Sequence, residues 1–237
     1  MLNGKRILGI TLARGGSKGV SKKNVRILNG HPLICHTISE ALKSHYIDDY
    51  IVSTDCPEIA DIADKAGAEL PFLRPKSISG DKATSASAII HAVEHLRDNK
   101  GRQYDYVVEL MATNPLKEVC DIDGCIERAV IDDRDCCVAV HRIWDQHPSR
   151  VKKMVQGKLV NFYPEIPESR RQDLTPPAFI RSGSIYVTSV DYLLSSGARY
   201  GTDNTYAYVL PDERVVNIDN IDDFRLAEVK LKNRGRK

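Results

Sequence analysis

Long apolar segments are missing from this 237-residue sequence. No stretch approaches the roughly 18 consecutive apolar residues of a membrane span, and residues 1–10 lack the apolar core and cleavage site of a signal peptide. Hydrophobic residues make up 42% and charged residues 28%, which is ordinary globular composition and excludes a disordered or low-complexity chain. We therefore expect one cytoplasmic α/β domain over residues 1–237, without a membrane partner.

Cysteine pairs of the C-x-x-C type are also missing, which argues against a zinc site or a redox dithiol. We expect reduced, mostly buried thiols, because free cysteine prefers the protein interior. The six cysteines are Cys35, Cys56, Cys120, Cys125, Cys136 and Cys137.

Acidic residues are absent from the first 39 positions, which contain seven cations. The remaining residues carry 27 cations and 32 acids. A positive segment on an otherwise acidic chain indicates a polyanionic ligand held at one place. The aromatic residues that favour single-stranded nucleic acid are not interleaved there, so we expect no nucleic-acid partner.

Apolar runs alternate with amphipathic segments over the first 141 residues, which predicts a mostly parallel sheet with helices on both faces. We predict strands at 7–13, 50–53, 69–73, 106–112, 137–141, 184–188, 206–210 and 215–218, and helices at 32–43, 57–66, 84–96, 121–131 and 221–233. After residue 141 the alternation of strands and helices stops. Residues 150–155 and 159–163 predict a β-hairpin about Gln156-Gly157, followed by a proline-bearing stretch. Such an insert often forms a dimer arm or a lid.

A glycine-rich loop, LARGGSKGVSKKN at 12–24, follows the first strand. Its glycines let backbone N–H groups approach an anion and its cations supply charge, so a triphosphate is the natural ligand. The residues concerned are Gly15, Gly16, Gly19, Arg14, Lys18 and Lys23. Neither the Walker pattern nor G-x-G-x-x-G is present, so the loop indicates neither a P-loop NTPase nor a Rossmann oxidoreductase.

Residues 13–24, ARGGSKGVSKKN, resemble the N-terminal signature of the acylneuraminate (nonulosonic acid) cytidylyltransferases, which make CMP-sugars from CTP. Six further blocks match in order: VSTD at 52–55, LRP at 73–75 with DKATS at 81–85, TNPL at 113–116, RRQD at 170–173, SGSIY at 182–186 and NID at 217–219. The resemblance covers essentially the whole chain. It implies the nucleotide-diphospho-sugar transferase type of Rossmann-like fold and a homodimer whose insert, residues 143–180 here, helps to complete the partner's acceptor site.

The same resemblance implies roles for individual residues. For the phosphates of CTP it implies Ala13, Arg14, Gly15, Gly16, Ser17, Lys18, Lys23 and Asn24, and for cytosine and ribose Arg74, Ala83 and Ser85. Ser85 is interpreted equally well as the N-cap of a helix. For the acceptor sugar acid it implies Thr113, Arg171, Gln172 and Ser182.

The family's metal site is an Asp-Ile-Asp segment, and this chain has Asn217-Ile218-Asp219. Asp219 is the candidate Mg²⁺ ligand, while Asn217 offers a neutral oxygen but no charge. We interpret the other Asp-Ile-Asp, at 121–123, as acids in the first turn of a helix.

Met111 and Ser182 stand where the family has a glutamine and an asparagine, which favours a variant acceptor such as legionaminic or pseudaminic acid. The implied reaction is attack by the acceptor's anomeric hydroxyl on the α-phosphate of CTP, with Arg14, Lys18, Lys23 and Asp219 as catalytic candidates. Two alternatives stay open. One is a related enzyme that uses 3-deoxy-manno-octulosonate or a sugar 1-phosphate, and the other is a nucleotide-binding protein without catalysis.

Overall fold

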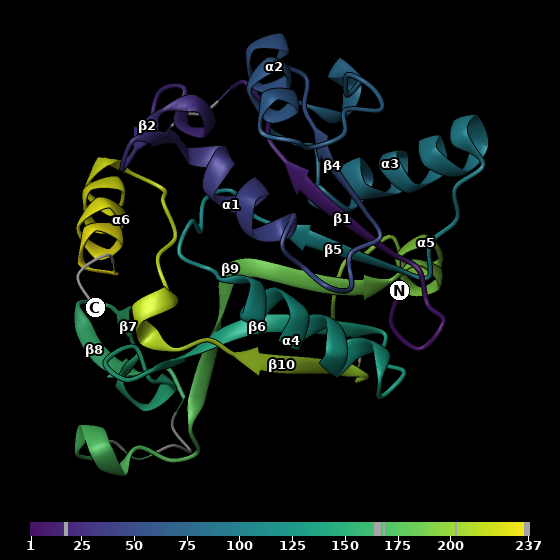
Figure 1. The fold of residues 1–237 in the computed structure, drawn as a ribbon. Coiled ribbons are helices and arrows are strands. Elements are labelled where there is room, and N and C mark those ends of the chain that lie inside the picture. The colour runs from purple at the N-terminus through teal and green to yellow at the C-terminus, as the bar shows by residue number, and fades with distance from the viewer. Residues whose placement is uncertain (17–18, 164–166, 168, 202, 235–237) are drawn as a thin grey trace.

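A six-stranded sheet forms the centre of the computed structural model, which describes residues 1–16, 19–163, 167, 169–201 and 203–234. The strand order is β10-β6-β9-β5-β1-β4 (Figure 1). The strands are β1 (Ile7–Leu12), β4 (Asp49–Ser53), β5 (Tyr106–Leu110), β6 (Cys136–Ile143), β9 (Ala178–Ser189) and β10 (Thr205–Val209). Only β9 among them runs antiparallel to its neighbours. The predicted fold class is confirmed.

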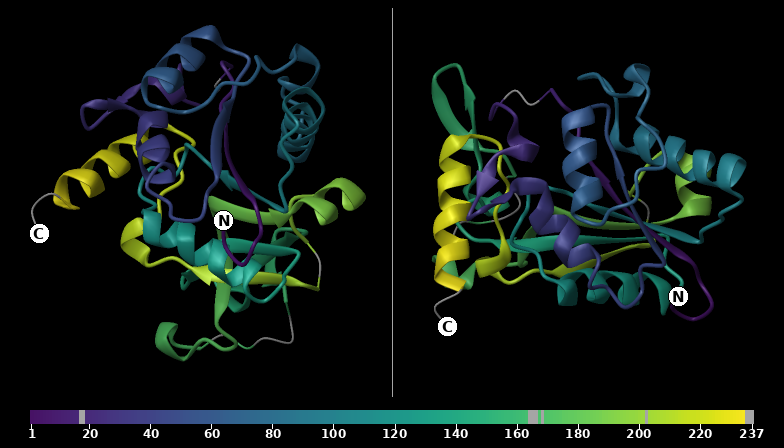
Figure 2. Two further views of the ribbon diagram at one scale, coloured as in Figure 1. Left: turned by 45° about the vertical axis from the view of Figure 1, so that its right-hand side comes forward. Right: turned by 45° about the horizontal axis from the view of Figure 1, so that its top comes forward.

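Helices cover both faces of this sheet, as the views in Figure 2 show. The elements are α1 (Leu33–Ala41), α2 (Pro57–Lys65) and α4 (Val119–Val130) on one face, and α3 (Ser85–Lys100) and α5 (Val190–Ser196) on the other. Alternation along β5 divides its side chains between the two cores, because Val108 packs with the first group of helices and Val107 with the second. Burying each such aliphatic side chain contributes about 1.5–3 kcal/mol.

The last helix, α6 (Ile221–Arg234), packs beside the short strand β2 (Ile27–Leu28), which pairs with β3 (His31–Pro32). A third apolar cluster joins Phe224 of α6 to Leu28, Leu116 and Ile218. This cluster holds the segment before α6 against the N-terminal part of the chain, although the two lie nearly 200 positions apart in the sequence.

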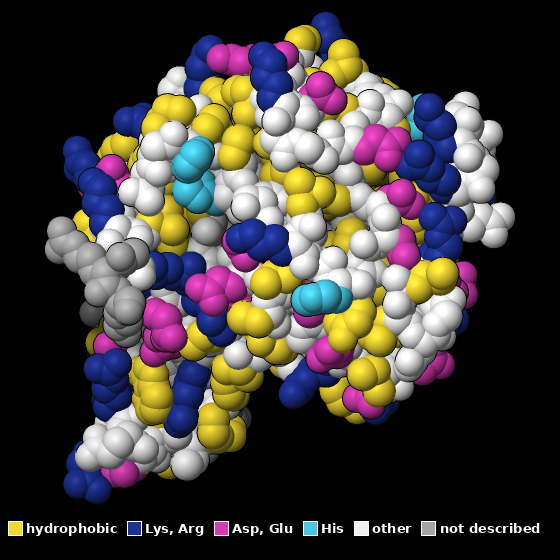
Figure 3. Space-filling model, in the orientation of Figure 1, with side chains coloured by type: hydrophobic (Ala, Val, Ile, Leu, Met, Phe, Trp, Pro, Cys, Tyr) yellow, Lys and Arg dark blue, Asp and Glu magenta, His cyan; other side chains and the backbone are white. Residues whose placement is uncertain are grey.

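The predicted hairpin is present as β7 (Lys152–Val155) and β8 (Lys158–Asn161). Its turn residues, Gln156 and Gly157, both have positive φ, as a two-residue turn with the right twist requires. The hairpin projects from the body, and its lobe in Figure 3 displays lysine or arginine and hydrophobic side chains next to one another. Met154 and Leu159 are 76% and 72% exposed.

Two predicted strands are wrong. Residues 69–73 contribute a single bridge, from Glu69 to Ile51, because Pro71 has no N–H with which to continue a ladder. Residues 215–218 stay outside the sheet because Val216 and Ile218 pack in the cluster around α6.

Two further features differ from the sequence-based expectations. Helix α5 was not expected, and β9 is 12 residues long where five were predicted.

All six cysteines are free: Cys125, Cys136 and Cys137 are buried, Cys35 and Cys56 are half-buried, and Cys120 is exposed. Within the described residues, every helix is too short or too polar to cross a membrane.

Candidate active site

Two adjoining cavities lie at the carboxyl ends of β1 and β5, where ligands bind in open α/β sheets. The first, of about 280 Å³, is lined by residues that include Arg14, Lys23, Asn24, Ser85, Thr113 and Asp219. The second, of about 240 Å³, is lined by residues that include Arg74, Ala83, Thr84 and Ser85. Leu12, Arg14 and Ser85 belong to both. The structure therefore brings together site residues predicted from four distant parts of the sequence.

Hydrogen bonds to its backbone hold the start of the glycine-rich loop in a defined position at the end of β1. Gly15 N donates to Asp55 Oδ1 at 3.0 Å, and the buried Asn24 donates through Nδ2 to the carbonyl of Arg14 at 3.2 Å. Ala13 N donates to the carbonyl of Ser53, and Gly16 is exposed. Ser17 and Lys18 lie outside the described residues.

Gly19 makes the tightest backbone approach in the site. A Cβ built on Gly19 would lie 1.9 Å from the carbonyl oxygen of Asp219, so only glycine fits there. Lys23 reinforces the same contact, since its Nζ donates to the carbonyl of Ile218 at 2.7 Å. The loop and the candidate metal segment thus form one unit.

Lys23 and Arg14 both line the first cavity, but they differ in burial and in their partners. Lys23 is half-buried, and burial lowers its pKa while the charge of Asp219 opposes that effect. Arg14 is partly exposed and forms an ion pair with Asp81 at 2.8 Å. Exposed pairs of this kind contribute little, about 0–1 kcal/mol, so Arg14 can exchange Asp81 for a ligand phosphate at small cost.

Arg74 lies at the second cavity and is nearly buried. Its Nε donates to Ser79 Oγ at 3.2 Å; burial lowers its pKa, and the nearby Asp55 carboxylate opposes this.

The N-cap of α3 is Thr84, whose Oγ1 accepts from Ser87 N, and Ser85 is the first helical residue. The interpretation of Ser85 as the N-cap is wrong, and its hydroxyl is therefore not used in capping.

The candidate metal ligands lie side by side, since Asn217 Nδ2 donates to Asp219 Oδ2 at 2.7 Å. Asp223 fixes the segment by accepting from the backbone N–H groups of Asp219 and Asn220. No group of three or more His, Cys, Asp and Glu side chains suited to a metal occurs in the part of the chain that the structure describes. One carboxylate beside one amide fits Mg²⁺, which usually binds one or two protein carboxylates together with substrate phosphates and water.

Asp121 of the other Asp-Ile-Asp segment lies in the first turn of α4. There it forms a capping box with Glu118 and an ion pair with Arg214. The interpretation as helix-start acids is confirmed for Asp121, whereas Asp123 lies beyond the first turn and contacts Ser44 and His45.

The four residues predicted for the acceptor side are in different places. Thr113 lines the first cavity, and its buried Oγ1 has no hydrogen-bond partner among the described residues. Ser182 is buried and donates to the carbonyl of Ala139. Arg171 and Gln172 are exposed in a 3₁₀ turn of the insert, and within one chain they do not reach either cavity.

Lys117 is a site residue that sequence reasoning missed. It is 1% exposed, and its Nζ donates to Thr37 Oγ1, Met111 O and Asn114 O at 2.5–2.8 Å. These bonds hold the turn after β5 that presents Met111 and Thr113 to the first cavity. Burial lowers the pKa of Lys117 to about 7, against the opposing charges of Glu40 and Asp121. The available sequence signal was its position in the TNPLK stretch at 113–117, which directly follows a predicted strand.

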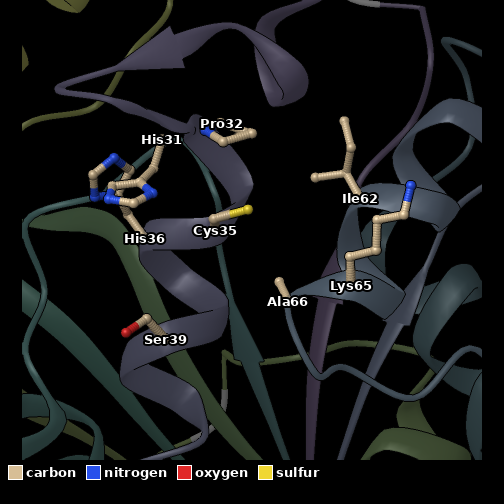
Figure 4. A pocket seen from close by; sticks show the side chains of 8 residues that line it. All are labelled: His31, Pro32, Cys35, His36, Ser39, Ile62, Lys65 and Ala66. Carbon is tan, nitrogen blue, oxygen red and sulfur yellow. The ribbon is translucent and has the colours of Figure 1, made fainter.

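A larger hollow, of about 510 Å³, separates α1 from α2 (Figure 4). Cys35 on α1 points toward α2, which contributes Ile62 and Lys65, while the rings of His31 on β3 and His36 on α1 lie together on the other side of α1. Burial raises the pKa of the Cys35 thiol, which disfavours a nucleophilic role. None of the described residues predicted for the site lines this hollow, so the two cavities at the sheet edge are the candidate active site.

The fold and the paired cavities define an α/β protein with a cation-lined site at the carboxyl edge of its sheet, and comparisons with known proteins identify its family. A sequence profile described as "Cytidylyltransferase" matches residues 8–151. The pseudaminic acid cytidylyltransferase of Campylobacter jejuni is 32% identical over 93% of this chain and 94% of its own. The CMP-N,N'-diacetyllegionaminic acid synthase of Legionella pneumophila is 33% identical over 94% of this chain and 95% of its own.

Among solved structures, a CMP:2-keto-3-deoxy-manno-octonic acid synthetase complexed with CTP superposes with a TM-score of 0.70 at 16% identity. The match covers 97% of this chain and 99% of that one, and it shows the common fold. The chain belongs to the cytidylyltransferase family.

We predict that Gly19→Ala weakens nucleotide binding at least tenfold, because the new methyl group displaces the loop from Asp219. Gly101→Ala is the control for a general loss of stability, since Gly101 ends α3 with positive φ, has nothing within 4 Å of its Cβ position and lines neither cavity. Titration calorimetry with CTP measures both variants. Equal affinities in the two would contradict the packing described.

A second prediction concerns Lys117 and pH. The lysine of the unfolded chain keeps its proton to about pH 10.4, whereas the folded protein releases it near pH 7, so unfolding takes up a proton between these values. The free energy of unfolding therefore rises with pH across this window, by at most about 1.4 kcal/mol per pH unit. Urea unfolding at pH 6 to 9 should show this rise in the natural protein and lose it in Lys117→Met. If the free energy of unfolding depends on pH in the same way in the natural protein and in Lys117→Met, the buried amine does not titrate in this range.

Proposed function

We propose that this protein transfers CMP from CTP to the anomeric hydroxyl of a nonulosonic acid and releases pyrophosphate. The observation that carries the proposal is the convergence of Arg14, Lys23 and Asp219 on one cavity that adjoins a second one around Arg74. Membership of the cytidylyltransferase family supports CTP as the nucleotide.

The two cavities divide the nucleotide between them. The cytosine occupies the cavity of Arg74 and Ala83, and the triphosphate lies against the glycine-rich loop, with Arg14 and Lys23 at the phosphates. Attack on the α-phosphate places negative charge on its oxygens and on the leaving pyrophosphate. Lys23, held by the carbonyl of Ile218, stabilises that charge from a fixed position, Arg14 joins it by exchanging Asp81 for the phosphate, and the sequence resemblance adds Lys18.

Asp219, with the side-chain oxygen of Asn217, would hold a Mg²⁺ ion together with the phosphates. The ion supplies neutralisation of the phosphate charge. Asp223 and Gly19 keep Asp219 in place, so the chain's own contribution is a preset position for the metal ligand.

The acceptor lies beyond the α-phosphate, on the side of Met111 and Thr113. Two relatives are named for pseudaminic acid and for N,N'-diacetyllegionaminic acid, and these are the acceptors we favour. Thr113 Oγ1, which lacks a partner among the described residues, is available for a polar group of the sugar.

The six free cysteines agree with a cytoplasmic location.

We also propose that residues 143–180 form the dimer contact. Its hairpin exposes Met154 and Leu159 almost completely, and Phe179 and Ile180 are about half exposed beside it. Apolar side chains grouped in this way on a projecting element are typical of an interface. In such a dimer Arg171 serves the partner's acceptor, since a guanidinium binds a carboxylate through two hydrogen bonds.

Pyrophosphate release tests the reaction. With CTP and Mg²⁺ we expect release with pseudaminic or legionaminic acid, and much less with N-acetylneuraminic acid or 3-deoxy-manno-octulosonate. UTP should not replace CTP, and Lys23→Met should lower kcat about 100-fold, the usual cost of losing one donor to developing charge. No release with any of these acceptors, in a protein that binds CTP, would contradict the proposed reaction.

Light scattering tests the dimer. Met154→Asp with Leu159→Asp should convert a dimer into monomers, because two buried carboxylates without partners oppose association. Ile131→Asp is the control, since Ile131 is 57% exposed at the end of α4, away from the insert. A natural protein that is already monomeric at micromolar concentration would contradict the proposed interface.

A further inference from the structure

Glu109 is a charged residue near the carboxyl end of strand β5. It is 2% exposed, and it pairs in register with Ile10 of β1 and Tyr186 of β9. It points to the same face of the sheet as Val107, toward the start of α3. A carboxylate at such a depth is costly unless it has a partner and a use.

Arg199 is that partner, from the loop that follows α5. Its guanidinium forms an ion pair with Glu109 and lies over the Tyr186 ring at 4.1 Å. Its carbonyl accepts from Thr188 Oγ1 at 2.7 Å, so backbone and side chain are both fixed. Burial raises the pKa of Glu109, whereas Arg199 and a hydrogen bond from the Ser85 side chain oppose this and favour the carboxylate.

The carboxylate faces the first cavity, close to where the two cavities meet. Glu109 lines the same cavity as Ser85, and Ser85 is one of the residues that both cavities share. A carboxylate repels phosphate and accepts hydrogen bonds from neutral donors such as hydroxyl groups. With the base on one side of the junction and the triphosphate on the other, the group at the junction is the ribose.

We propose that Glu109, held in place by Arg199, accepts hydrogen bonds from the ribose hydroxyls of the nucleotide and so selects ribonucleotides over deoxyribonucleotides. This rests on the proposed function only in that CTP binds in these cavities. Glu109 touches the ligand, and Arg199 is a positioning residue that acts through it.

Calorimetry with CTP, 2'-deoxy-CTP and 3'-deoxy-CTP tests the proposal without any turnover. The variants are Glu109→Gln and the double variant Glu109→Leu with Arg199→Met, which leaves no unpaired charge if the single variant folds poorly. Glu69→Gln is the matched control, because it removes a Glu–Arg pair, with Arg102, far from the cavities. Thermal melting establishes that each variant is folded.

We expect the natural protein and Glu69→Gln to bind CTP at least about tenfold more tightly than one of the deoxy analogues, the size expected for a hydrogen bond to a charged group. In the Glu109 variants this ratio should fall below about threefold, because CTP binds more weakly while the analogue that lacks the bonded hydroxyl binds as before.

Equal loss of affinity for CTP and both analogues would overturn the proposal in favour of a structural role. Unchanged affinities for all three nucleotides, together with a raised KM for the acceptor in the pyrophosphate-release assay, would overturn it as well and assign the carboxylate to an acceptor hydroxyl. A natural protein that binds all three nucleotides equally overturns this inference alone, whereas one that binds none of them overturns the proposed function too.

Discussion

The contact of the glycine-rich loop with residues 218–219 is the constraint on which the site depends. Gly19 packs directly against the carbonyl of Asp219, and Lys23 donates to the carbonyl of Ile218. The N–H of Ile218 in turn donates to the carbonyl of Thr113. Three segments therefore meet at one residue, and each supplies a different part of the candidate site: phosphate ligands, a metal ligand and the acceptor side.

Large charged side chains are buried near this edge of the sheet, whereas the buried polar residues elsewhere in the sheet, such as Thr188, are small and uncharged. Lys117, Glu109 and Arg74 are all nearly inaccessible, and each has a fixed partner. Leaving one such group without its partner costs more than any exposed ion pair on this surface contributes. The buried polar contacts thus determine the shape of the site, whereas exposed pairs such as that of Arg14 with Asp81 remain exchangeable.

Most of the fold could be predicted, because buried parallel strands and amphipathic helices leave distinct periodicities. Prediction went wrong where tertiary contacts outweighed the local pattern, as at residues 215–218, which pack against α6 instead of joining the sheet. The positions of Arg14, Lys23 and Asp219 followed from the motifs, and the structure brings them together. Glu109 could not be predicted, since a single charge in an apolar run does not reveal its partner, and Lys117 was missed although it stands in the TNPLK stretch.

The most direct test of this account is a crystal structure of the protein with CTP. The account predicts the triphosphate against Arg14 and Lys23, the cytosine beside Arg74 and Ala83, and the ribose between them. A nucleotide in the hollow between α1 and α2, or one with its base at the Lys23 end, would contradict it.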